Sequence, residues 1–591
     1  MDALSPSAQP PGIRSRLLRE PVLVALGSLA FALLFAWPLL GHLGQFGAFH
    51  DWEFSTELHF VPYFTVWHYH QLPLWNPYKC GGMPMLGNPQ SRILTPFFLL
   101  HLLTGPVVGL HLEVILHLAL AWAGGYVLAR TIGISRIGAI VCASVFPSNA
   151  WFSLHLGEGH AVFLPAAYLP WIAALYILAS NRRRLFPASV AGLLLALCLW
   201  EGGLYVAIFG VVLIASLTAP MVIVRKSLWP LWSAVCVAAF GAGFIMIKLL
   251  PALEVFRAHP REPMGGEGNP WSLLISLLTS RNQDILGPGP GFGFQEYGAY
   301  ISLAFLVLAA LGVFGGWRKS FPWIVSGAVF ILMARGDSGS HSIWVLLRSI
   351  RVFAVLISAM RLPSRFLGPM ILSLAVLAGL GADLLGRIAR PWGARLSLAV
   401  LLVGLIDALL VGPPNLKYIF RDSTPRLPQS WEFRQMRQLG AKFNMTHVAE
   451  ANMGALECYE YTDIDTKVVG YDQEGYRGEQ FLIGPGKVQI ERWTPNDLTY
   501  SVSSLAPTVL AINQNYDPGW VLTKVIGLVL SRDGLLGVAV PAGNQTIRLT
   551  YRSKPFDYGL ILAVLAAVAM LLLWRYENAE HTDSTKVGQA G

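Results

Sequence analysis

Long apolar runs alternate with short polar segments along most of the chain. A helix that crosses the hydrocarbon core of a bilayer needs about 20 mostly apolar residues, and most of the runs approach that length. The segment 93–104 is apolar but short, so we expect it to re-enter the membrane or to lie at its surface. We expect twelve membrane-spanning helices, over residues 21–41, 106–129, 137–153, 161–180, 186–200, 203–224, 229–250, 298–316, 321–335, 366–386, 396–412 and 556–574.

The block 413–555 has a different pattern, because apolar and polar residues alternate in its second half. A period of two residues is typical of a half-buried strand. Turn-forming residues such as Asp517-Pro518-Gly519 separate the alternating runs. We therefore expect a small antiparallel β domain next to the last span, with strands at 498–504, 508–514, 535–540 and 546–551.

The composition supports a membrane protein and limits its partners. Hydrophobic residues make up 54% of the 591 residues and charged residues 13%, whereas soluble domains carry about 25% charged residues. Soluble, disordered and fibrous classes are therefore excluded, and the bilayer is the expected partner. The net charge of +9 does not indicate nucleic-acid binding, because the basic residues lie in short loops between spans, as they do in cytoplasmic loops. These clusters are Arg14, Arg16 and Arg19; Arg130 and Arg136; Arg182, Arg183 and Arg184; Arg225 and Lys226; Arg318 and Lys319; and Arg387, Arg390 and Arg395.

The resulting organisation has both chain ends in the cytoplasm. We expect a cytoplasmic tail at 1–20, a helical membrane module at 21–412 with a long outer loop at 42–105, an extracytoplasmic β-rich domain at 413–555, and a last span with a tail at 556–591. Three cysteines fall in apolar runs and are typical of small core residues. Cys80 and Cys458 fall in polar segments, where they either form a disulfide or remain separate.

The first outer loop holds acids close to a membrane boundary. His50, Asp51 and Glu53 lie within about a dozen residues of the outer end of the first span. A carboxylate there can take a proton from an attacking hydroxyl group, or bind a metal ion together with Glu53 or His50. The alternative is a hydrated acid with no chemical task. Position alone leaves both interpretations open.

Two further acids lie at outer ends of predicted spans. Glu158 and His160, with His155 before them, could bind Zn²⁺ or Mn²⁺, but their spacing is not the helical zinc pattern. Hydrogen bonding in an outer vestibule is the alternative. Glu201 ends an apolar run, and such an acid is costly unless it lines a wet cavity.

Arginines on the outer face run against the positive-inside bias and need a local reason. Arg257 follows Glu254 closely, and Arg361 and Arg365 precede a span. A guanidinium group binds phosphate through paired hydrogen bonds and stays charged. Anchoring to lipid headgroups is the alternative explanation. The chain has no glycine-rich phosphate loop and no internal duplication of the kind that transporters show.

Short motifs spread over residues 20–575 together resemble those of a known family. They are His50-Asp51; Pro73-Leu74-Trp75-Asn76-Pro77-Tyr78; Gly81-Gly82; Asn88-Pro89-Gln90-Ser91; Gly159-His160; Pro170-Trp171; Gly202-Gly203; Leu250-Pro251 with Glu254; Arg361-Leu362-Pro363-Ser364-Arg365-Phe366; Tyr516-Asp517-Pro518-Gly519-Trp520; and Val540-Pro541-Ala542-Gly543. This set resembles the YfhO-like family of bacterial membrane proteins, within the GT-C superfamily of polytopic glycosyltransferases.

The resemblance implies a multi-pass enzyme of the bacterial inner membrane with an extracytoplasmic active site. It implies inverting transfer of a sugar from a polyprenyl-phosphate donor to a cell-envelope glycan or lipid acceptor. Asp51-Trp52-Glu53 is similar to the acidic pair of GT-C enzymes, with Glu53 in place of the second Asp, so dependence on Mg²⁺ or Mn²⁺ stays open. Asp51 would be the general base, assisted by Glu53.

Other roles follow from the same resemblance. The donor phosphate would be bound by Arg361, Arg365 and Arg257, and the sugar or acceptor by His50, Glu158, His160, Glu201 and Glu254. Two alternatives fit the same spans and outer arginines. One is a transporter or flippase of lipid-linked sugars, and the other is a non-catalytic assembly protein of the cell envelope.

Overall fold

The computed structural model describes residues 12–45, 51–259, 270–280, 294–336, 342–350, 360, 362–417, 419–420, 430–437, 448–458, 464–523 and 527–587. The predicted site residues His50 and Arg361, and the side chain of Glu53, lie outside this description. All other predicted site residues are within it.

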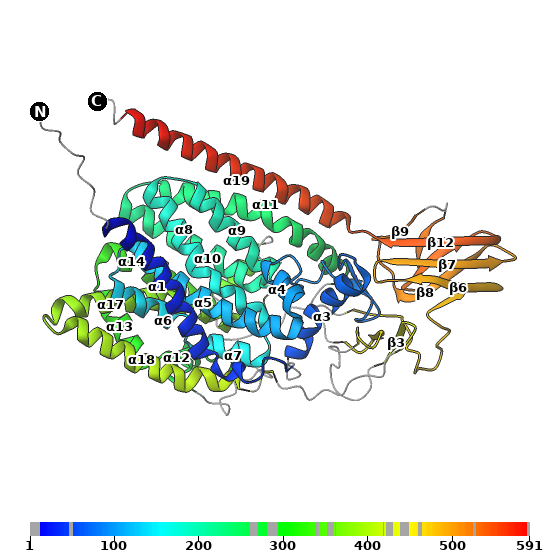
Figure 1. The fold of residues 1–591 in the computed structure, drawn as a ribbon, viewed down its shortest axis with the longest axis horizontal. Coiled ribbons are helices and arrows are strands. Elements are labelled where there is room, and N and C mark those ends of the chain that lie inside the picture. Colours follow the sequence, from blue (N-terminus) through cyan, green and yellow to red (C-terminus); the bar gives the residue numbers. More distant parts are fainter. Residues whose placement is uncertain are drawn as a thin grey trace, which may run out of the picture.

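The helices pack as one bundle, and the two larger sheets project from one end of it (Figure 1). The β strands are given with their sheets below. The helices are α1 (Gly12–Phe35), α2 (Trp37–Leu40), α3 (Trp52–Tyr69), α4 (Pro96–Thr104), α5 (Pro106–Ile132), α6 (Arg136–Val145), α7 (Ala150–Glu158), η1 (Ala161–Tyr168), α8 (Leu169–Arg182), α9 (Phe186–Trp200), α10 (Leu204–Arg225), α11 (Trp229–Ala258), α12 (Pro270–Leu278), η2 (Phe294–Glu296), α13 (Leu303–Val313), α14 (Trp317–Ala334), α15 (Ile343–Ser349), η3 (Pro363–Phe366), α17 (Leu367–Ile388), α18 (Gly393–Leu416) and α19 (Lys554–Val587).

Every predicted span contains helix, and eight helices among the described residues are long and apolar enough to cross a membrane. These eight coincide with eight of the twelve predicted spans. The other four predicted spans correspond to α1, α9, α13 and α14, so the number twelve stays a prediction. Helix α4 covers most of 93–104 and has nine residues, which is too short to cross a bilayer.

The outer end of one predicted span differs from the prediction. We expected a helix over 137–153 followed by a turn at 154–160, but α6 ends at Val145 and α7 runs from Ala150 to Glu158. Pro147 cannot donate a backbone hydrogen bond, and the Asn149 side chain caps α7 by accepting from the Phe152 amide at 3.0 Å. Glu158 therefore ends a helix instead of lying in an open turn.

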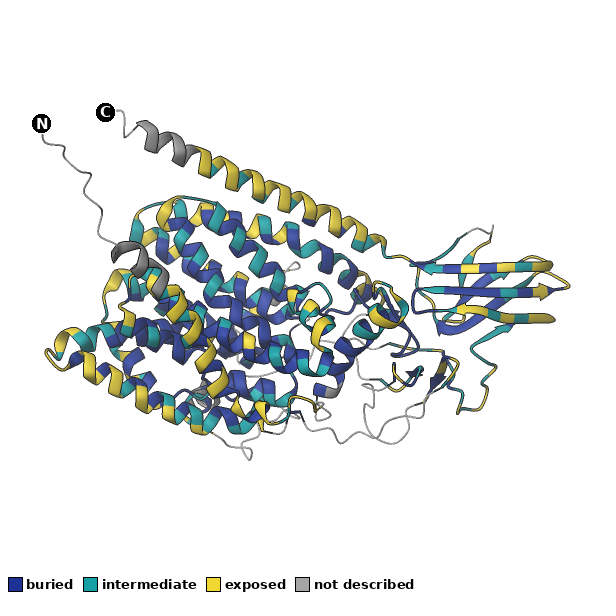
Figure 2. Cartoon of the chain, in the orientation of Figure 1, coloured by how far each residue is buried: buried dark blue, intermediate teal, exposed yellow. Residues whose placement is uncertain are grey.

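Small residues let the membrane helices approach closely. A Cβ on Gly312 of α13 would overlap the Leu377 carbonyl of α17, and a Cβ on Gly381 would overlap the Leu308 carbonyl. Such contacts between small residues are how helices pack in lipid. The interior of the bundle is buried, whereas α19 is exposed along most of its length (Figure 2).

The C-terminal region forms two four-stranded sheets of antiparallel pairs, as predicted. One sheet has the order β10-β11-β8-β5 and the other β6-β7-β12-β9. Their strands are β5 (Gln480–Leu482), β6 (Gly486–Trp493), β7 (Asp497–Ser504), β8 (Thr508–Asn515), β9 (Trp520–Leu522), β10 (Val529–Arg532), β11 (Leu535–Val540) and β12 (Gly543–Tyr551). The four predicted strands are β7, β8, β11 and β12. Two short pairs lie outside these sheets, β1 (Trp75–Asn76) with β2 (Met83–Pro84) and β3 (Arg434–Met436) with β4 (Met453–Ala455).

The first outer loop joins the β domain to the membrane module. Trp75 is buried in the core of the sheets, where its indole donates to the Gln514 side chain at 2.9 Å. Cys80 and Cys458 form a disulfide with their Cα atoms 5.4 Å apart, which settles the open alternative. The β domain is therefore connected to the loop covalently as well as by packing.

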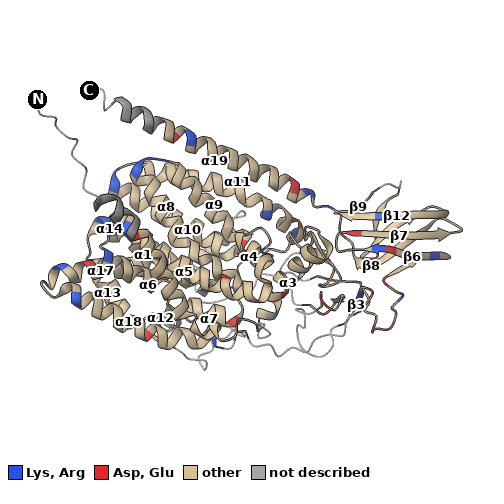
Figure 3. Cartoon of the chain, viewed as in Figure 1, with Lys and Arg blue, Asp and Glu red and all other residues tan. Residues whose placement is uncertain are grey.

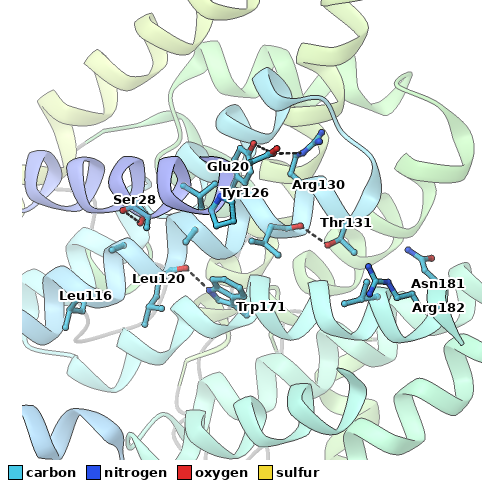
Figure 4. Close-up of a pocket in the computed structure, with 17 residues that line it drawn as sticks. Glu20, Ser28, Leu116, Leu120, Tyr126, Arg130, Thr131, Trp171, Asn181 and Arg182 are labelled. Atoms are coloured by element: carbon cyan, nitrogen blue, oxygen red, sulfur yellow. Dashed lines mark hydrogen bonds and ion pairs between the residues drawn. The ribbon is translucent and has the colours of Figure 1, made fainter. Parts of the chain in front are cut away.

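Lysine and arginine residues gather at the end of the bundle where the two chain termini lie, opposite the sheets (Figure 3). This distribution agrees with the predicted placement of the basic loops on one side of a membrane. Near that basic end, a cavity of about 870 Å³ lies between α1, α5 and α8, where Tyr126 donates to Glu20 at 2.8 Å (Figure 4). None of the predicted site residues lines this cavity.

Candidate active site

Asp51 lies at the N-terminus of α3. It occupies the N-cap position, and its side chain is 36% exposed. The partial positive charge of a helix N-terminus stabilises a carboxylate there. The carboxylate of Asp51 therefore lies at a helix N-terminus and is partly accessible to a substrate.

Gly159 brings the end of α7 against the start of α3. Its φ of 98° is a left-handed conformation, and a Cβ at this position would overlap the Trp52 amide nitrogen. Only glycine permits this approach without strain. Hydrogen bonds hold the contact, because the Asp51 amide donates to the Glu158 carbonyl at 3.0 Å and the Trp52 indole donates to the Leu156 carbonyl at 2.6 Å.

His160 joins Asp51 to a second carboxylate. Its Nε2 atom lies 3.3 Å from Asp51 Oδ2 and 3.7 Å from Glu296 Oε1. Its Nδ1 atom lies 2.8 Å from Nδ1 of His155. The carboxyl group of Glu158 lies close enough to interact electrostatically with His160, Asp51 and Glu296. The predicted residues Asp51, Glu158 and His160 thus share one site.

Glu296 and Arg365 form the buried side of the site. The Arg365 Nε atom donates to Glu296 Oε2 at 2.8 Å, and a second guanidinium nitrogen bonds the other carboxylate oxygen. Burial opposes ionisation of Glu296, but the charges of Arg365 and His160 outweigh it and hold the pKa of this carboxyl well below its ordinary value. The Arg365 guanidinium also lies 4.7 Å from the centre of the Tyr205 ring. The Glu296–Arg365 ion pair therefore lies next to His160, on the buried side of the site.

Sequence reasoning missed Glu296. It lies next to residues outside the described part of the chain, in a glycine-rich stretch with no helical or strand pattern. Only the fold brings it to Arg365, which is 69 positions later in the chain.

The residues around His160 fit a divalent cation. One ligand atom from each of His155, His160 and Glu296 lies within 4.8 Å of the others, and His155 Nε2 is buried without a hydrogen-bond partner. Two imidazoles with a carboxylate suit Mn²⁺ or Zn²⁺ better than Mg²⁺, which prefers oxygen ligands.

A second group of charges, which the sequence analysis did not identify, is buried inside the bundle. Arg92 is 4% exposed and pairs with Glu113, and the same guanidinium nitrogen lies 3.8 Å from Glu201. His101 Nε2 lies 2.7 Å from Glu113 Oε2, and the Tyr168 hydroxyl donates to Glu201 at 2.6 Å. The predicted site residue Glu201 therefore belongs to this buried network and not to the group around Asp51.

His117 extends this network. Its Nδ1 atom lies 2.8 Å from the Glu113 backbone carbonyl, which can only accept, so Nδ1 donates this hydrogen bond. Its Nε2 atom lies 2.8 Å from Glu201 Oε2. His117 therefore connects the two acids of the network.

The network also holds the start of η1, the segment that directly follows His160. Arg92 donates to the carbonyl of Ala161 at 3.1 Å, and Ala161 follows His160 directly. Lys248 of α11 is also buried, and its ammonium group donates to the carbonyls of Asn88 and Ser91 at 2.6 and 3.1 Å. Two buried cations thus fix the segment 88–92 and, through it, the start of η1.

Two predicted site residues lie elsewhere. Glu254 and Arg257 are exposed near the outer end of α11. Glu254 lines a cavity of about 260 Å³ together with Asp517 of the β domain. Neither residue belongs to the group around Asp51, because α11 ends near the β domain rather than beside α7.

Comparisons with known proteins give weak structural likenesses only. No protein-family model matches the chain, and no curated protein matches it. Arabinofuranosyltransferase AftD from Mycobacteria aligns with a TM-score of 0.45 and 18% identity, over 76% of this chain and 32% of that chain. An oligosaccharyltransferase from Archaeoglobus fulgidus aligns with a TM-score of 0.44 and 11% identity, over 75% of this chain and 65% of that chain. The archaeal oligosaccharyltransferase AglB in complex with an inhibitory peptide and a dolichol-phosphate aligns with a TM-score of 0.42 and 13% identity, over 75% of this chain and 65% of that chain. This chain therefore spans less than two thirds of each of these proteins.

Proposed function

We propose that this chain is a membrane glycosyltransferase that moves a sugar from a polyprenyl-phosphate donor to a hydroxyl group of a cell-envelope glycan or lipid. The observation that carries the proposal is the partly exposed Asp51 carboxylate, 3.3 Å from His160 and backed by the Glu296–Arg365 ion pair. The sequence motifs that resemble GT-C enzymes support it. The orientation of the basic loops supports an outer location for the reaction, in a bacterial inner membrane.

In the proposed reaction, Asp51 takes the proton of the acceptor hydroxyl as that oxygen bonds to the anomeric carbon. The bond between this carbon and the phosphate oxygen breaks on the opposite face, so the configuration inverts. The leaving polyprenyl phosphate keeps the electron pair of the broken bond. A general base of this kind typically contributes a factor of about 10²–10⁴ to the rate.

The other residues bind and orient. Arg365 is partly buried beside the site and, with Arg361, supplies positive charge for the donor phosphate. Glu158 and His160 are placed to bind hydroxyl groups of the sugar or acceptor. His155, His160 and Glu296 would hold a divalent cation, which would supply further charge neutralisation of the phosphate.

The substitution Asp51→Asn tests the general base. We expect transfer of labelled sugar in proteoliposomes to fall by about 10²–10⁴-fold, because an amide cannot take the proton. Asp557→Asn is the matched control, since Asp557 is an exposed acid in the first turn of α19. Full activity of Asp51→Asn would show that Asp51 is not the base. If the lipid carrier changes leaflet but keeps its sugar, the protein is a transporter.

Metal dependence is tested by chelation. We expect EDTA to lower transfer and Mn²⁺ to restore it better than Mg²⁺, because the site offers two imidazole nitrogens. His155→Ala should lower the bound metal measured by elemental analysis of the purified protein. Undiminished transfer after complete metal removal would contradict a role for the cation.

A further inference from the structure

A second cleft lies in the outer part of the molecule, away from Asp51. It has a volume of about 590 Å³ and is lined by the C-terminal end of α3, by β3 and by strands of both sheets. None of the residues assigned to the reaction lines it. A cleft of this size suits several rings of a small polar ligand.

Aromatic rings form much of the cleft wall. Phe433 and Trp493 stack with ring centres 4.4 Å apart, and Tyr69 meets Trp493 edge-on at 5.8 Å. These contacts hold the rings before any ligand arrives. Trp431 lies at the same cleft and is fully exposed. Together with the stacked rings, this exposed indole extends the aromatic surface that a ligand in the cleft can contact.

Polar side chains lie between these rings, and their charges nearly balance. Glu432, Glu479 and Glu491 face the guanidinium groups of Arg434 and Arg492 around the cleft. Such a lining does not favour a polyanion or a lipid phosphate. Glu479 is fixed because its carboxylate accepts from the Gln435 amide at 2.8 Å and from the Tyr476 hydroxyl at 3.0 Å.

We propose that this cleft binds a neutral oligosaccharide and thereby holds the acceptor glycan. Sugar rings present flat C–H faces that pack on aromatic rings, and pairs of hydroxyl groups that match planar carboxylate, amide and guanidinium groups. The cleft offers both kinds of partner side by side, with little net charge. The assignment of the ligand as the acceptor rests on the proposed glycosyltransferase function.

Helix α3 links this cleft to the candidate active site. Asp51 occupies the N-cap position, and His68 and Tyr69 at the C-terminal end of the helix line the cleft. The helix has 18 residues, which corresponds to about 27 Å at a rise of 1.5 Å per residue. An acceptor that occupies both places must therefore be a chain of several sugar units, and short acceptors would reach Asp51 without contacting the cleft.

Binding is tested on the full chain in nanodiscs with labelled neutral hexasaccharides of gluco, manno, galacto and arabino configuration. We expect at least one of them to bind, and Trp431→Ala and Arg492→Ala to weaken that binding tenfold or more. Leu505→Ala and Arg532→Ala are matched controls, since both residues are exposed on the β domain outside the cleft. Binding to none of the four, or equal binding by Trp431→Ala, would overturn the proposal. So would displacement of the sugar by an unstructured peptide or by anionic vesicles.

Two further measurements separate this inference from the proposed reaction. Asp51→Asn should bind the oligosaccharide normally while its transfer of sugar falls by about 10²–10⁴-fold. Trp431→Ala should raise the KM for long acceptors and leave kcat and the KM for a single-sugar acceptor unchanged. If transfer depends on Asp51 but Trp431→Ala alters no acceptor KM, the cleft is not an acceptor site, although the proposed reaction stands.

Discussion

At the scale of single residues, Gly159 decides whether Asp51 and His160 can meet. The chain turns there in a left-handed conformation, and the carbonyl groups of the last turn of α7 face donors of α3. The same glycine belongs to the Gly159-His160 motif that the sequence analysis singled out. Its task is geometric, because it allows two backbone segments to touch beside the carboxylate.

Replacing Gly159 by alanine should therefore separate these segments. We expect Gly159→Ala to lose most transfer activity and to unfold at a lower temperature, because the added Cβ meets the backbone of Asp51 and Trp52. Gly41→Ala is the control, since nothing lies within 4 Å of a Cβ there and its φ is −76°. Activity and thermal unfolding of both variants check the prediction. An active, stable Gly159→Ala protein would contradict the close contact.

Glu479 predicts a pH dependence of stability. Burial raises the pKa of its carboxyl from the ordinary 4.5 to about 7. The folded state therefore holds this proton more tightly than the unfolded state, so the stabilisation is complete below pH 4.5 and is lost as the pH rises through 7. We expect Glu479→Gln to flatten the fall of the unfolding temperature between pH 5 and 8, as followed by intrinsic fluorescence. Glu491→Gln, on the exposed side of β6, should leave that fall unchanged.

At the scale of elements, hydrophobic patterning was enough to predict the helices of the apolar runs and four strands, but not α3, which lies within the predicted outer loop 42–105. The apolar runs coincide with helices, and β7, β8, β11 and β12 appear where alternation predicted strands. Strands β5, β6, β9 and β10 were not predicted, because some are only three or four residues long and β6 is exposed at the edge of its sheet. An edge strand buries too little of one face to leave a clear alternation.

The buried charge network could not be predicted from the sequence. Each imidazole or carboxylate on α5 looks like an isolated polar residue in an apolar helix, and its partners come from other segments. Arg92 and Glu201 are 109 positions apart in the sequence, yet a carboxylate oxygen of Glu201 lies 3.8 Å from the guanidinium group of Arg92. Which polar residues share one interior depends on how the helices pack, and helical periodicity does not contain that information.

Substitution of Arg92 tests how much the network supports the fold. Arg92→Met leaves Glu113 buried without its main partner, and breaking such a pair costs about 3–5 kcal/mol. Arg130→Met is the control, because the Arg130–Glu20 pair is 39% and 33% exposed, and exposed pairs contribute about 0–1 kcal/mol. Denaturant unfolding of the purified full chain compares the two. Equal losses in the free energy of unfolding would show that the buried network stabilises the fold no more than an exposed ion pair does.

At the scale of the whole molecule, the β domain and the membrane module form one unit. Trp75 lies among the buried side chains of the sheets, and the Asn515 side chain donates to the carbonyls of Cys80 and Gly82 at 2.7 and 2.9 Å. The motif around Trp75 is one of those that carry the family resemblance. In the structure it is the part of the first outer loop that is inserted into the β domain.

Loss of the Cys80–Cys458 disulfide should weaken the attachment of the β domain to the membrane module. The bridge joins positions 378 residues apart, and a native disulfide typically contributes about 2–4 kcal/mol. We expect Cys458→Ser to speed proteolysis of the β domain while the bundle stays intact. Cys142→Ala is the control, since Cys142 is a free buried cysteine of α6. Unchanged proteolysis of Cys458→Ser would show that packing alone holds the domain.

The position of β12 has a consequence for how the protein is made. This strand pairs with both β7 and β9, and only Arg552 and Ser553 separate it from the start of α19. One sheet therefore stays incomplete until residues 543–551 have been synthesised. If the sheets face outward, the segment before β12 leaves the ribosome before the strand that completes its sheet. Translation that stops before β12 should thus release a domain with an open sheet edge, a target for quality-control proteases.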